Sequence, residues 1–259
     1  MGAAAATACS APISVLCAMS SRQSSSSMMS PVPMGTIFAY VDTITCMAPT
    51  SKAMRKAADH LVAVDPAFGP IVEFSPLCNI GREKYEDRTH FSTLVTSVIA
   101  QQLSVKAADT ITIRVTTSLG GDITPLAVVQ ASEADLRTAG LSGAKTRTIK
   151  GLAEAVHSGD LDLEAAAAHS EDQHIVTELT RLWGIGRWTA EMFLMFTLHR
   201  LDVWPVGDLA MRKGWQQIHG NNGDITEKQI DPLGEQFRPY RSVAAWYCWR
   251  VIDGDSQTW

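Results

Sequence analysis

The stretch of sequence that says most about the fold is Leu182-Trp183-Gly184-Ile185-Gly186-Arg187-Trp188-Thr189-Ala190. Two glycines separated by one apolar residue predict a tight turn between two helices, because glycine adopts backbone angles that other residues resist. Ile185 is expected to anchor this turn in the core. The helix that begins near Arg187 would present free N–H groups at its start, and with the helix dipole they favour an anion such as phosphate. An ordinary helix–helix turn is the alternative for a bare Gly-x-Gly pattern.

A carboxylate follows at Asp208, in the run Val206-Gly207-Asp208-Leu209-Ala210-Met211. Its place before an apolar run predicts the start of a helix, where an aspartate side chain accepts hydrogen bonds from the first free N–H groups. A structural cap and a chemically active acid are both open interpretations of Asp208 at this point.

Apolar residues recur with helical spacing along most of the chain. No set of paired alternating strands is recognisable, so the sequence predicts an all-α domain. Serine residues at 51, 104 and 142 are expected to cap helices. The expected helices cover residues 51–60, 87–102, a segment after Ser104 that reaches Val115, 124–130, 132–138, 143–157, 161–168, 171–182, 187–199, 208–219, 225–236 and 240–252.

Residues 1–46 differ from the remaining chain in composition. They are rich in Ala, Ser, Met and Thr, and their only charged side chains are Arg22 and Asp42. Such a composition predicts a low-complexity, disordered extension at the N-terminus, or coding sequence upstream of a start near Met47. Organelle targeting is a weaker alternative, because one arginine is too few for a good transit peptide. The folded domain is therefore expected to occupy residues 47–259.

Composition and charge limit the function classes. The 259 residues are 46% hydrophobic and carry a formal net charge of −5, whereas a typical nucleic-acid-binding protein has a basic surface. Backbone amides and helix N-termini can still hold phosphate without side-chain charge. The five cysteines form no Cys-x-x-Cys pair and the histidines show no ligand spacing, so no metal site or other cofactor is expected. No apolar run reaches the length of about eighteen residues that a membrane span needs.

Five motifs follow one another in a consistent order and carry a family resemblance. They are FSTLVTSVIAQQLSVKAA (91–108), LRTAGLSGAKTRTIKGLAEAV (136–156), LWGIGRWTAEMFLMF (182–196), DVWPVGDLAMRKG (202–214) and RPYRSVAAWYCWR (238–250). Together they resemble the helix-hairpin-helix DNA glycosylases and, within them, the 3-methyladenine DNA glycosylase II family, over about residues 55–252. The resemblance implies an all-α fold in which two helical subdomains flank a cleft.

The resemblance also implies roles for matching residues. Asp208 matches the catalytic aspartate, and Gly184-Ile185-Gly186 matches the hairpin that binds backbone phosphate. Trp188 stands where bifunctional relatives carry a lysine that forms a Schiff base and cuts the strand. Because tryptophan has no amine, and the cysteine-ligated cluster of those relatives is also absent, a monofunctional hydrolase without lyase activity is expected.

A pocket for a base flipped out of the duplex is implied as well. A cationic alkylated base suits electron-rich rings, and the candidates to line this pocket are Trp188, Met192 and Trp249. Trp246 and Trp249 share one face of the last helix at i, i+3. Core packing is the alternative interpretation of both tryptophans.

Gln101, Gln102 and Leu103 lie at a predicted turn, where the family carries the residue that fills the gap left by the flipped base. Turn chemistry alone is the alternative. Lys145 lies in the locally basic segment 139–150 and is a candidate second phosphate contact, with a solvated helix face as the alternative.

Two basic residues follow Asp208 on the same predicted helix. Arg212 is a candidate DNA contact that could instead pair with acids, whereas its neighbour Lys213 is expected to face solvent.

The function that the resemblance implies is hydrolysis of the N-glycosidic bond of alkylated purines, of the 3-methyladenine and 7-methylguanine type, in base excision repair. A base alkylated on a ring nitrogen is already cationic and leaves as a neutral molecule, which agrees with the lack of an obvious second acid in the motif. The alternatives are a glycosylase for another damaged or deaminated base and a binding module without catalysis. The expected partner is double-stranded DNA with alkylated bases, bound by a monomer that is intracellular, in the cytoplasm, nucleoid or nucleus, and not attached to a membrane.

Overall fold

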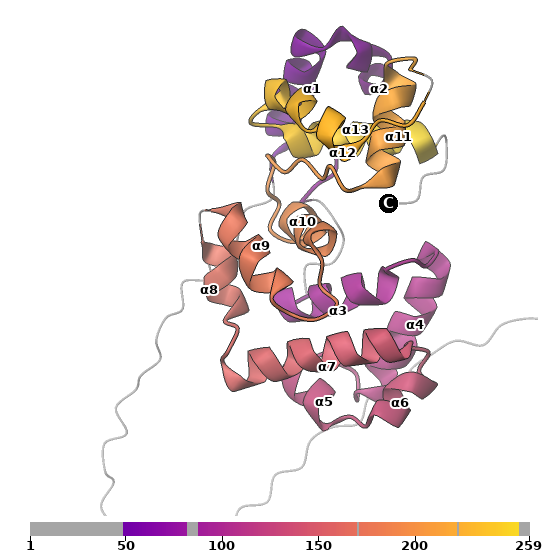
Figure 1. Ribbon diagram of the computed structural model, residues 1–259, viewed down its shortest axis with the longest axis vertical. Coiled ribbons are helices and arrows are strands. Elements are labelled where there is room, and N and C mark those ends of the chain that lie inside the picture. Colours follow the sequence, from indigo (N-terminus) through magenta and orange to yellow (C-terminus); the bar gives the residue numbers. More distant parts are fainter. Residues whose placement is uncertain (1–48, 82–87, 170, 222, 254–259) are drawn as a thin grey trace, which may run out of the picture. The chain divides into compact units, whose positions relative to one another are not determined.

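The computed structural model describes residues 49–81, 88–169, 171–221 and 223–253 (Figure 1). Every regular element in these ranges is a helix, which confirms the all-α prediction. The predicted disordered extension at 1–46 lies outside the described residues, as does the expected helix start at Asp87. None of the described helices is both long and apolar enough to cross a membrane.

The α-helices of the described ranges follow the predicted order closely. They are α1 (Ser51–Val64), α2 (Gly69–Phe74), α3 (His90–Ala100), α4 (Val105–Ser118), α5 (Pro125–Gln130), α6 (Glu133–Thr138), α7 (Gly143–Ser158), α8 (Leu163–Ala168), α9 (Asp172–Thr180), α10 (Arg187–Phe196), α11 (Leu209–Ile218), α12 (Glu227–Ile230) and α13 (Arg241–Asp253). Two short 3₁₀-helices accompany them, η1 (Pro66–Phe68) and η2 (Pro232–Phe237).

Side-chain caps explain where many of these helices begin, because a Ser, Thr or Asp oxygen accepts an N–H group that the helix itself leaves unpaired. The predicted caps at Ser104 and Ser142 are confirmed. The predicted cap at Ser51 is wrong: Thr50 Oγ1 accepts the Ala53 N–H at 3.2 Å, and Ser51 already lies inside α1.

Three segments differ from the predicted helices. Residues 66–74, which the sequence pattern left unassigned, form η1 and α2. The helix expected over 225–236 is divided into α12 and η2, because Pro232 has no N–H group to continue the α-helical hydrogen bonding. α10 ends at Phe196 instead of continuing to His199, whose φ of +54° is not helical.

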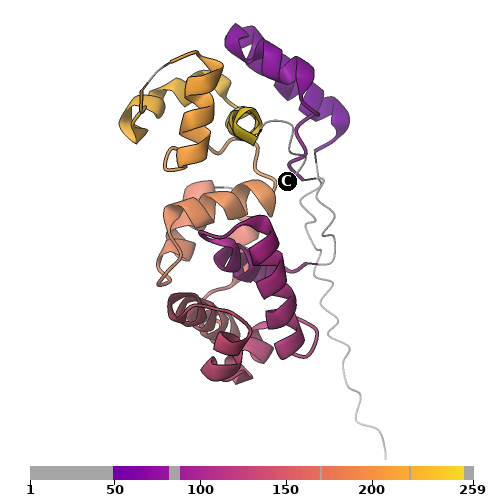
Figure 2. The same ribbon diagram turned by 90° about the vertical axis from the view of Figure 1, so that its right-hand side faces the viewer.

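The described helices pack in two groups (Figures 1 and 2). The terminal group contains α1, α2, α11, α12 and α13, with α11 and α1 both packed on α13. The central group contains α3 to α10, with α7 packed on α3 and α5, and α10 packed on α3 and α9. The chain therefore leaves the terminal group after α2 and returns to it after α10, as expected for two helical subdomains.

Close contact between α11 and α13 depends on Gly214. A Cβ atom at this position would overlap the backbone carbonyl of Cys248, so only glycine lets the two helices approach this closely. Trp215, the next residue, packs its buried ring edge-on against Trp204, with ring centroids 5.9 Å apart. The close contact at Gly214 fixes α11, which begins beside Asp208, against α13, which carries Trp249.

Candidate active site

The hairpin between α9 and α10 needs glycine at its first position. Gly184 has φ +84°, in the region that other residues rarely adopt, and a Cβ atom there would overlap the Thr148 side chain of α7. Ile185 is only 3% exposed, and its N–H group donates to the Leu182 carbonyl at 3.1 Å. The prediction that Ile185 anchors the turn in the core is confirmed.

Gly186 differs from the expectation that both glycines supply unusual angles. Its φ of −90° and ψ of 171° are extended backbone that any residue adopts. A Cβ atom at Gly186 would meet no heavy atom within 4 Å, so the space around it is open. Gly186 precedes α10, and no side chain caps that helix. The first N–H groups of α10 are therefore accessible to an anion.

Two substitutions in the hairpin should separate folding from phosphate binding. Gly186→Ala should change stability by no more than about 0.5 kcal/mol, and it should weaken binding to damaged and undamaged duplex alike, since phosphate contacts carry no base information. Gly184→Ala should cost about 1–3 kcal/mol of stability because of its positive φ. Thermal melting and anisotropy titration of plain duplex measure the two effects. Wild-type affinity in a folded Gly186→Ala protein would show that the hairpin is only a structural turn.

Asp208 caps α11 and also holds two indoles. Its Oδ1 accepts the Met211 N–H at 2.6 Å and the Trp249 Nε1–H at 2.9 Å. Its Oδ2 accepts the Trp188 Nε1–H at 2.6 Å. The cap interpretation is thus correct, and it leaves the carboxylate in contact with both predicted pocket tryptophans. Three donors to one carboxylate fix its orientation.

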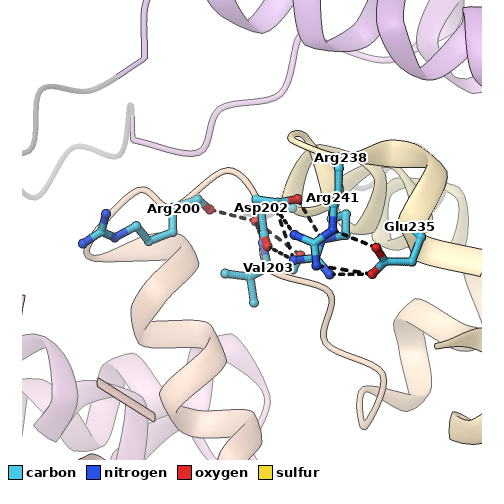
Figure 3. Close-up of polar contacts among 7 residues, drawn as sticks. Arg200, Asp202, Val203, Glu235, Arg238 and Arg241 are labelled. Atoms are coloured by element: carbon cyan, nitrogen blue, oxygen red, sulfur yellow. Dashed lines mark hydrogen bonds and ion pairs between the residues drawn. The ribbon is translucent and has the colours of Figure 1, made fainter. Parts of the chain in front are cut away.

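The segment between α10 and α11, which carries Asp208, is tied to the start of α13 (Figure 3). Asp202 accepts hydrogen bonds from Arg238 and from Arg241, whose Nε lies 2.7 Å from Asp202 Oδ1. The buried Ser242 hydroxyl donates to the Arg200 carbonyl at 2.7 Å and accepts the Val203 N–H at 2.9 Å. These bonds hold the chain segment that leads to Asp208 against α13, the helix that carries Trp249.

The pocket residues proposed from the sequence differ in exposure. Trp188 is 40% exposed and Met192, one turn later on α10, is partly buried. Trp249 is only 7% exposed and packs beside Phe196, with ring centroids 5.8 Å apart. Trp246 is a core residue whose Nε1–H donates to Asn79 Oδ1 at 2.8 Å, which confirms its core interpretation. Contact of Trp188, Met192 and Trp249 with a base stays a prediction.

Residues 101–103 form the predicted turn between α3 and α4. Gln101 Nε2 donates to Thr189 Oγ1 of α10 at 3.0 Å, so this side chain is tied to the hairpin helix. Gln102 is exposed and has φ +58°, and Leu103 is 39% exposed. Which of Gln101, Gln102 and Leu103 fills the gap left by a flipped base stays a prediction.

The Lys145 side chain bonds to the backbone of this turn and does not simply face solvent. Its Nζ donates to the carbonyls of Ile99 at 2.8 Å and Gln101 at 2.7 Å, and burial lowers its pKa. Lys150 of the same helix likewise donates to the carbonyls that end α5, the shortest bond being 2.7 Å to Ala131. The basic segment thus binds backbone carbonyls at two helix ends. A phosphate contact of Lys145 is untested by these bonds and becomes the alternative to its structural role.

Arg212 supports the loop before Asp208. Its Nη1 donates to the Val206 carbonyl at 2.7 Å and lies 3.5 Å from Glu227 Oε1, with most of the side chain buried. This is the ion-pair alternative for Arg212, and its DNA contact stays a prediction. Lys213 is exposed, as predicted.

Glu191 is a buried carboxylate next to the hairpin that the sequence analysis did not single out. It is 3% exposed and accepts a hydrogen bond from Arg187 Nε at 2.8 Å, and burial raises its pKa. The i, i+4 spacing of Arg187 and Glu191 on a predicted helix would have indicated this ion pair from the sequence. The pair holds Arg187 at the first position of α10, beside the open N–H groups.

A cavity of about 630 Å³ lies on another side of α10, lined by Arg187, Glu191 and Leu194 among others. Its lining does not include Asp208, Trp188 or Met192. The cavity is therefore separate from the carboxylate of Asp208. Among the described residues, no group of His, Cys, Asp or Glu side chains is arranged to hold a metal ion.

A glycine hairpin with an uncapped helix start, followed by a carboxylate that accepts hydrogen bonds from two indoles, agrees with the helix-hairpin-helix class that the sequence predicts. Residues 95–239, more than half of the chain, match the family described as HhH-GPD superfamily base excision DNA repair protein. The chain belongs to this family.

Individual relatives agree with this assignment. DNA-3-methyladenine glycosylase 1 of Schizosaccharomyces pombe is 32% identical over 201 residues, which cover 77% of this chain and 88% of that protein. The structure of the Schizosaccharomyces pombe 3-methyladenine DNA glycosylase in complex with abasic DNA has a TM-score of 0.68 at 31% identity, covering 79% of this chain and all of that one. A DNA-3-methyladenine glycosidase from Bacillus halodurans has a TM-score of 0.64 at 36% identity, covering 74% of this chain and 87% of the other.

Proposed function

We propose that this chain is a DNA glycosylase that removes alkylated purines from double-stranded DNA by hydrolysing the N-glycosidic bond. The observation that carries the proposal is the environment of Asp208, whose two oxygens accept the indole N–H groups of Trp188 and Trp249. The same Trp188 lies in the first turn of α10, beside the open hairpin. Relatives named as 3-methyladenine glycosylases support the class of substrate.

The chemistry follows from the charge that develops during bond cleavage. The sugar becomes positively charged as the base departs, and a fixed carboxylate stabilises that charge and orients a water molecule. A purine alkylated on a ring nitrogen leaves as a neutral molecule, so a general acid is not required. An exposed indole such as Trp188 offers a face on which the cationic base stacks.

We infer further that the chain hydrolyses the N-glycosidic bond without cutting the DNA strand. Strand cleavage by a Schiff base requires an amine at the reacting carbon, and the residue beside Asp208 on α10 is Trp188, which has none. One chain supplies the carboxylate, both indoles and the hairpin, which supports action as a monomer. A glycosylase for a deaminated base is the alternative within the same class.

A lesion panel tests the substrate class. Duplexes that each carry one 7-methylguanine, ethenoadenine or hypoxanthine, together with DNA treated with a methylating agent to supply 3-methyladenine, are incubated with the protein and the free bases are separated by chromatography. Release of the methylated purines fastest supports the proposal. Preferential release of hypoxanthine would assign the chain to deaminated bases, and release of no base with retained DNA binding would make it a binding module.

Lys145→Met should reduce excision several-fold while leaving affinity for plain duplex within about twofold. The reason is that Lys145 holds the carbonyls of Ile99 and Gln101, so its loss loosens the turn that carries Gln102 and Leu103. Single-turnover excision and plain-duplex titration at two salt concentrations distinguish the roles. A marked loss of plain-duplex affinity with a shallower salt dependence would instead make Lys145 a phosphate contact.

We propose residues 47–259 as the functional domain. Deleting residues 1–46 should therefore alter neither the melting temperature nor the turnover number, since the segment is of low complexity and contains none of the five motifs. Calorimetry and excision kinetics of the full and shortened chains provide the comparison. A large fall in melting temperature after the deletion would show that the extension packs on the domain.

A further inference from the structure

The two carboxylate oxygens of Asp208 have unequal partners. Oδ1 accepts two hydrogen bonds, from the Met211 amide at 2.6 Å and from Trp249 Nε1 at 2.9 Å. The Met211 amide belongs to the first turn of α11, and Trp249 is almost fully buried on α13. Neither donor can leave without movement of a packed helix, so Oδ1 is fixed in place.

Oδ2 accepts a hydrogen bond from Trp188 Nε1 at 2.6 Å. Trp188 is an exposed side chain next to the hairpin, in contrast to the buried Trp249. Its indole can turn away from Asp208 by a side-chain rotation, without displacing a helix. Oδ2 is therefore the oxygen whose partner is exchangeable.

A hydrogen bond from a neutral donor to a carboxylate withdraws charge from the accepting oxygen. The proposed reaction needs that charge at the sugar, where positive charge develops. The indole of Trp188 thus competes with the reacting sugar for the same oxygen. The same indole is also the exposed ring on which a flipped base would stack.

We propose that Trp188 is a releasable cover over Oδ2 of Asp208, and that Trp249 is a positioning residue which holds the carboxylate through Oδ1. Positive charge at the sugar position displaces the Trp188 N–H group from Oδ2, and stacking of the flipped base on the indole keeps it turned away. Entry of the base and exposure of the carboxylate charge become one event, so undamaged duplex leaves Asp208 covered. This inference rests on the proposed function and describes the regulation of the same site.

The test replaces a single N–H group. Tryptophan at 188 or at 249 is exchanged for 3-benzothienylalanine, which keeps the ring shape and carries sulfur in place of N–H. The probes are two duplexes with an abasic-site mimic, one with a cationic pyrrolidine ring and one with a neutral tetrahydrofuran ring. Melting temperatures of both variants are measured beside binding.

The two variants should respond in opposite directions. Loss of the N–H group at Trp188 should tighten binding of the cationic mimic by about tenfold relative to the neutral mimic, since a hydrogen bond to a charged group no longer has to be broken. Loss of the N–H group at Trp249 should weaken it by about tenfold, because the Met211 N–H alone then holds Oδ1 and the carboxylate no longer keeps Oδ2 in place, which outweighs the charge returned to Oδ1. A shift in the same direction for both, or no shift at 188, would overturn the proposal.

Indole resonances provide a second measurement that needs no base excision. In nitrogen-15 spectra, Asp208→Asn should move the Nε1–H signals of Trp188 and Trp249 in the free protein. Addition of the cationic duplex should move the Trp188 signal to a position typical of a solvent-bonded indole and leave that of Trp249 hydrogen-bonded. If the Trp188 signal in the complex stays at the position of an indole bonded to Asp208, the proposal that Trp188 is released from Oδ2 is contradicted. A chain that failed to excise any methylated base would overturn the proposed function, whereas these readouts judge the cover by itself.

Discussion

Asp208→Asn should lower the rate of base excision by at least about a hundredfold, while the protein keeps its fold and its affinity for plain duplex. A neutral amide cannot balance positive charge on the sugar, and the proposed phosphate contacts lie at the hairpin. Asparagine caps a helix as well as aspartate does, so the bond from the Met211 N–H to the cap is retained. The amide can satisfy one of the two indole donors through its oxygen, and its NH₂ group opposes the other.

Single-turnover excision from methylated duplex measures this loss, with melting temperature and plain-duplex affinity recorded on the same samples. Asp122→Asn is the matched control, because Asp122 is an exposed acid in the turn between α4 and α5. The control should excise at the wild-type rate. Near-normal excision by the Asp208→Asn protein would remove Asp208 from its assigned role.

Gly214→Ala should destabilise the protein by about 3 kcal/mol or more, since overpacking against a rigid partner is costly. The added Cβ atom meets the backbone carbonyl of Cys248, not a flexible side chain. Relief requires α11 and α13 to move apart, which displaces Asp208 at the start of one helix and Trp249 on the other. Stability and excision should therefore fall together.

Gly151→Ala is the control for this substitution. Gly151 also lies inside a helix, α7, but a Cβ atom there meets nothing within 4 Å. Alanine is favoured over glycine in a helix by about 1 kcal/mol, so this variant should melt at the wild-type temperature or above. Chemical denaturation of both proteins decides the point. Equal stability for Gly214→Ala and Gly151→Ala would mean that the two helices are less closely packed than the structure shows.

Local patterns in the sequence were sufficient to predict most of the fold. Apolar spacing and capping residues such as Ser104 and Ser142 placed the helices to within a few residues. The break at Pro232 was missed because helical periodicity continued across it. The assignment of Ser51 as a cap was wrong because adjacent Thr50 offers the same hydroxyl chemistry, and only backbone geometry distinguishes them.

The contacts within the site were less predictable. Asp208 lies twenty residues after Trp188 and forty-one before Trp249, and no periodic pattern reports which oxygen faces which indole. Lys145 looked like a free surface cation because its acceptors, the carbonyls of Ile99 and Gln101, lie more than forty residues away. Side-chain types indicated the chemistry, and packing between helices decided how those side chains are used.

The most direct test of the central claim counts three products from one incubation of methylated duplex with the protein. Free methylated purine is measured by chromatography, abasic sites by strand breaks after alkali, and nicks by strand breaks without alkali. The account predicts equal amounts of free base and abasic sites, with nicks no more frequent than in DNA incubated without protein. Absence of free base, or strand breaks that appear without alkali in proportion to the free base, would contradict it.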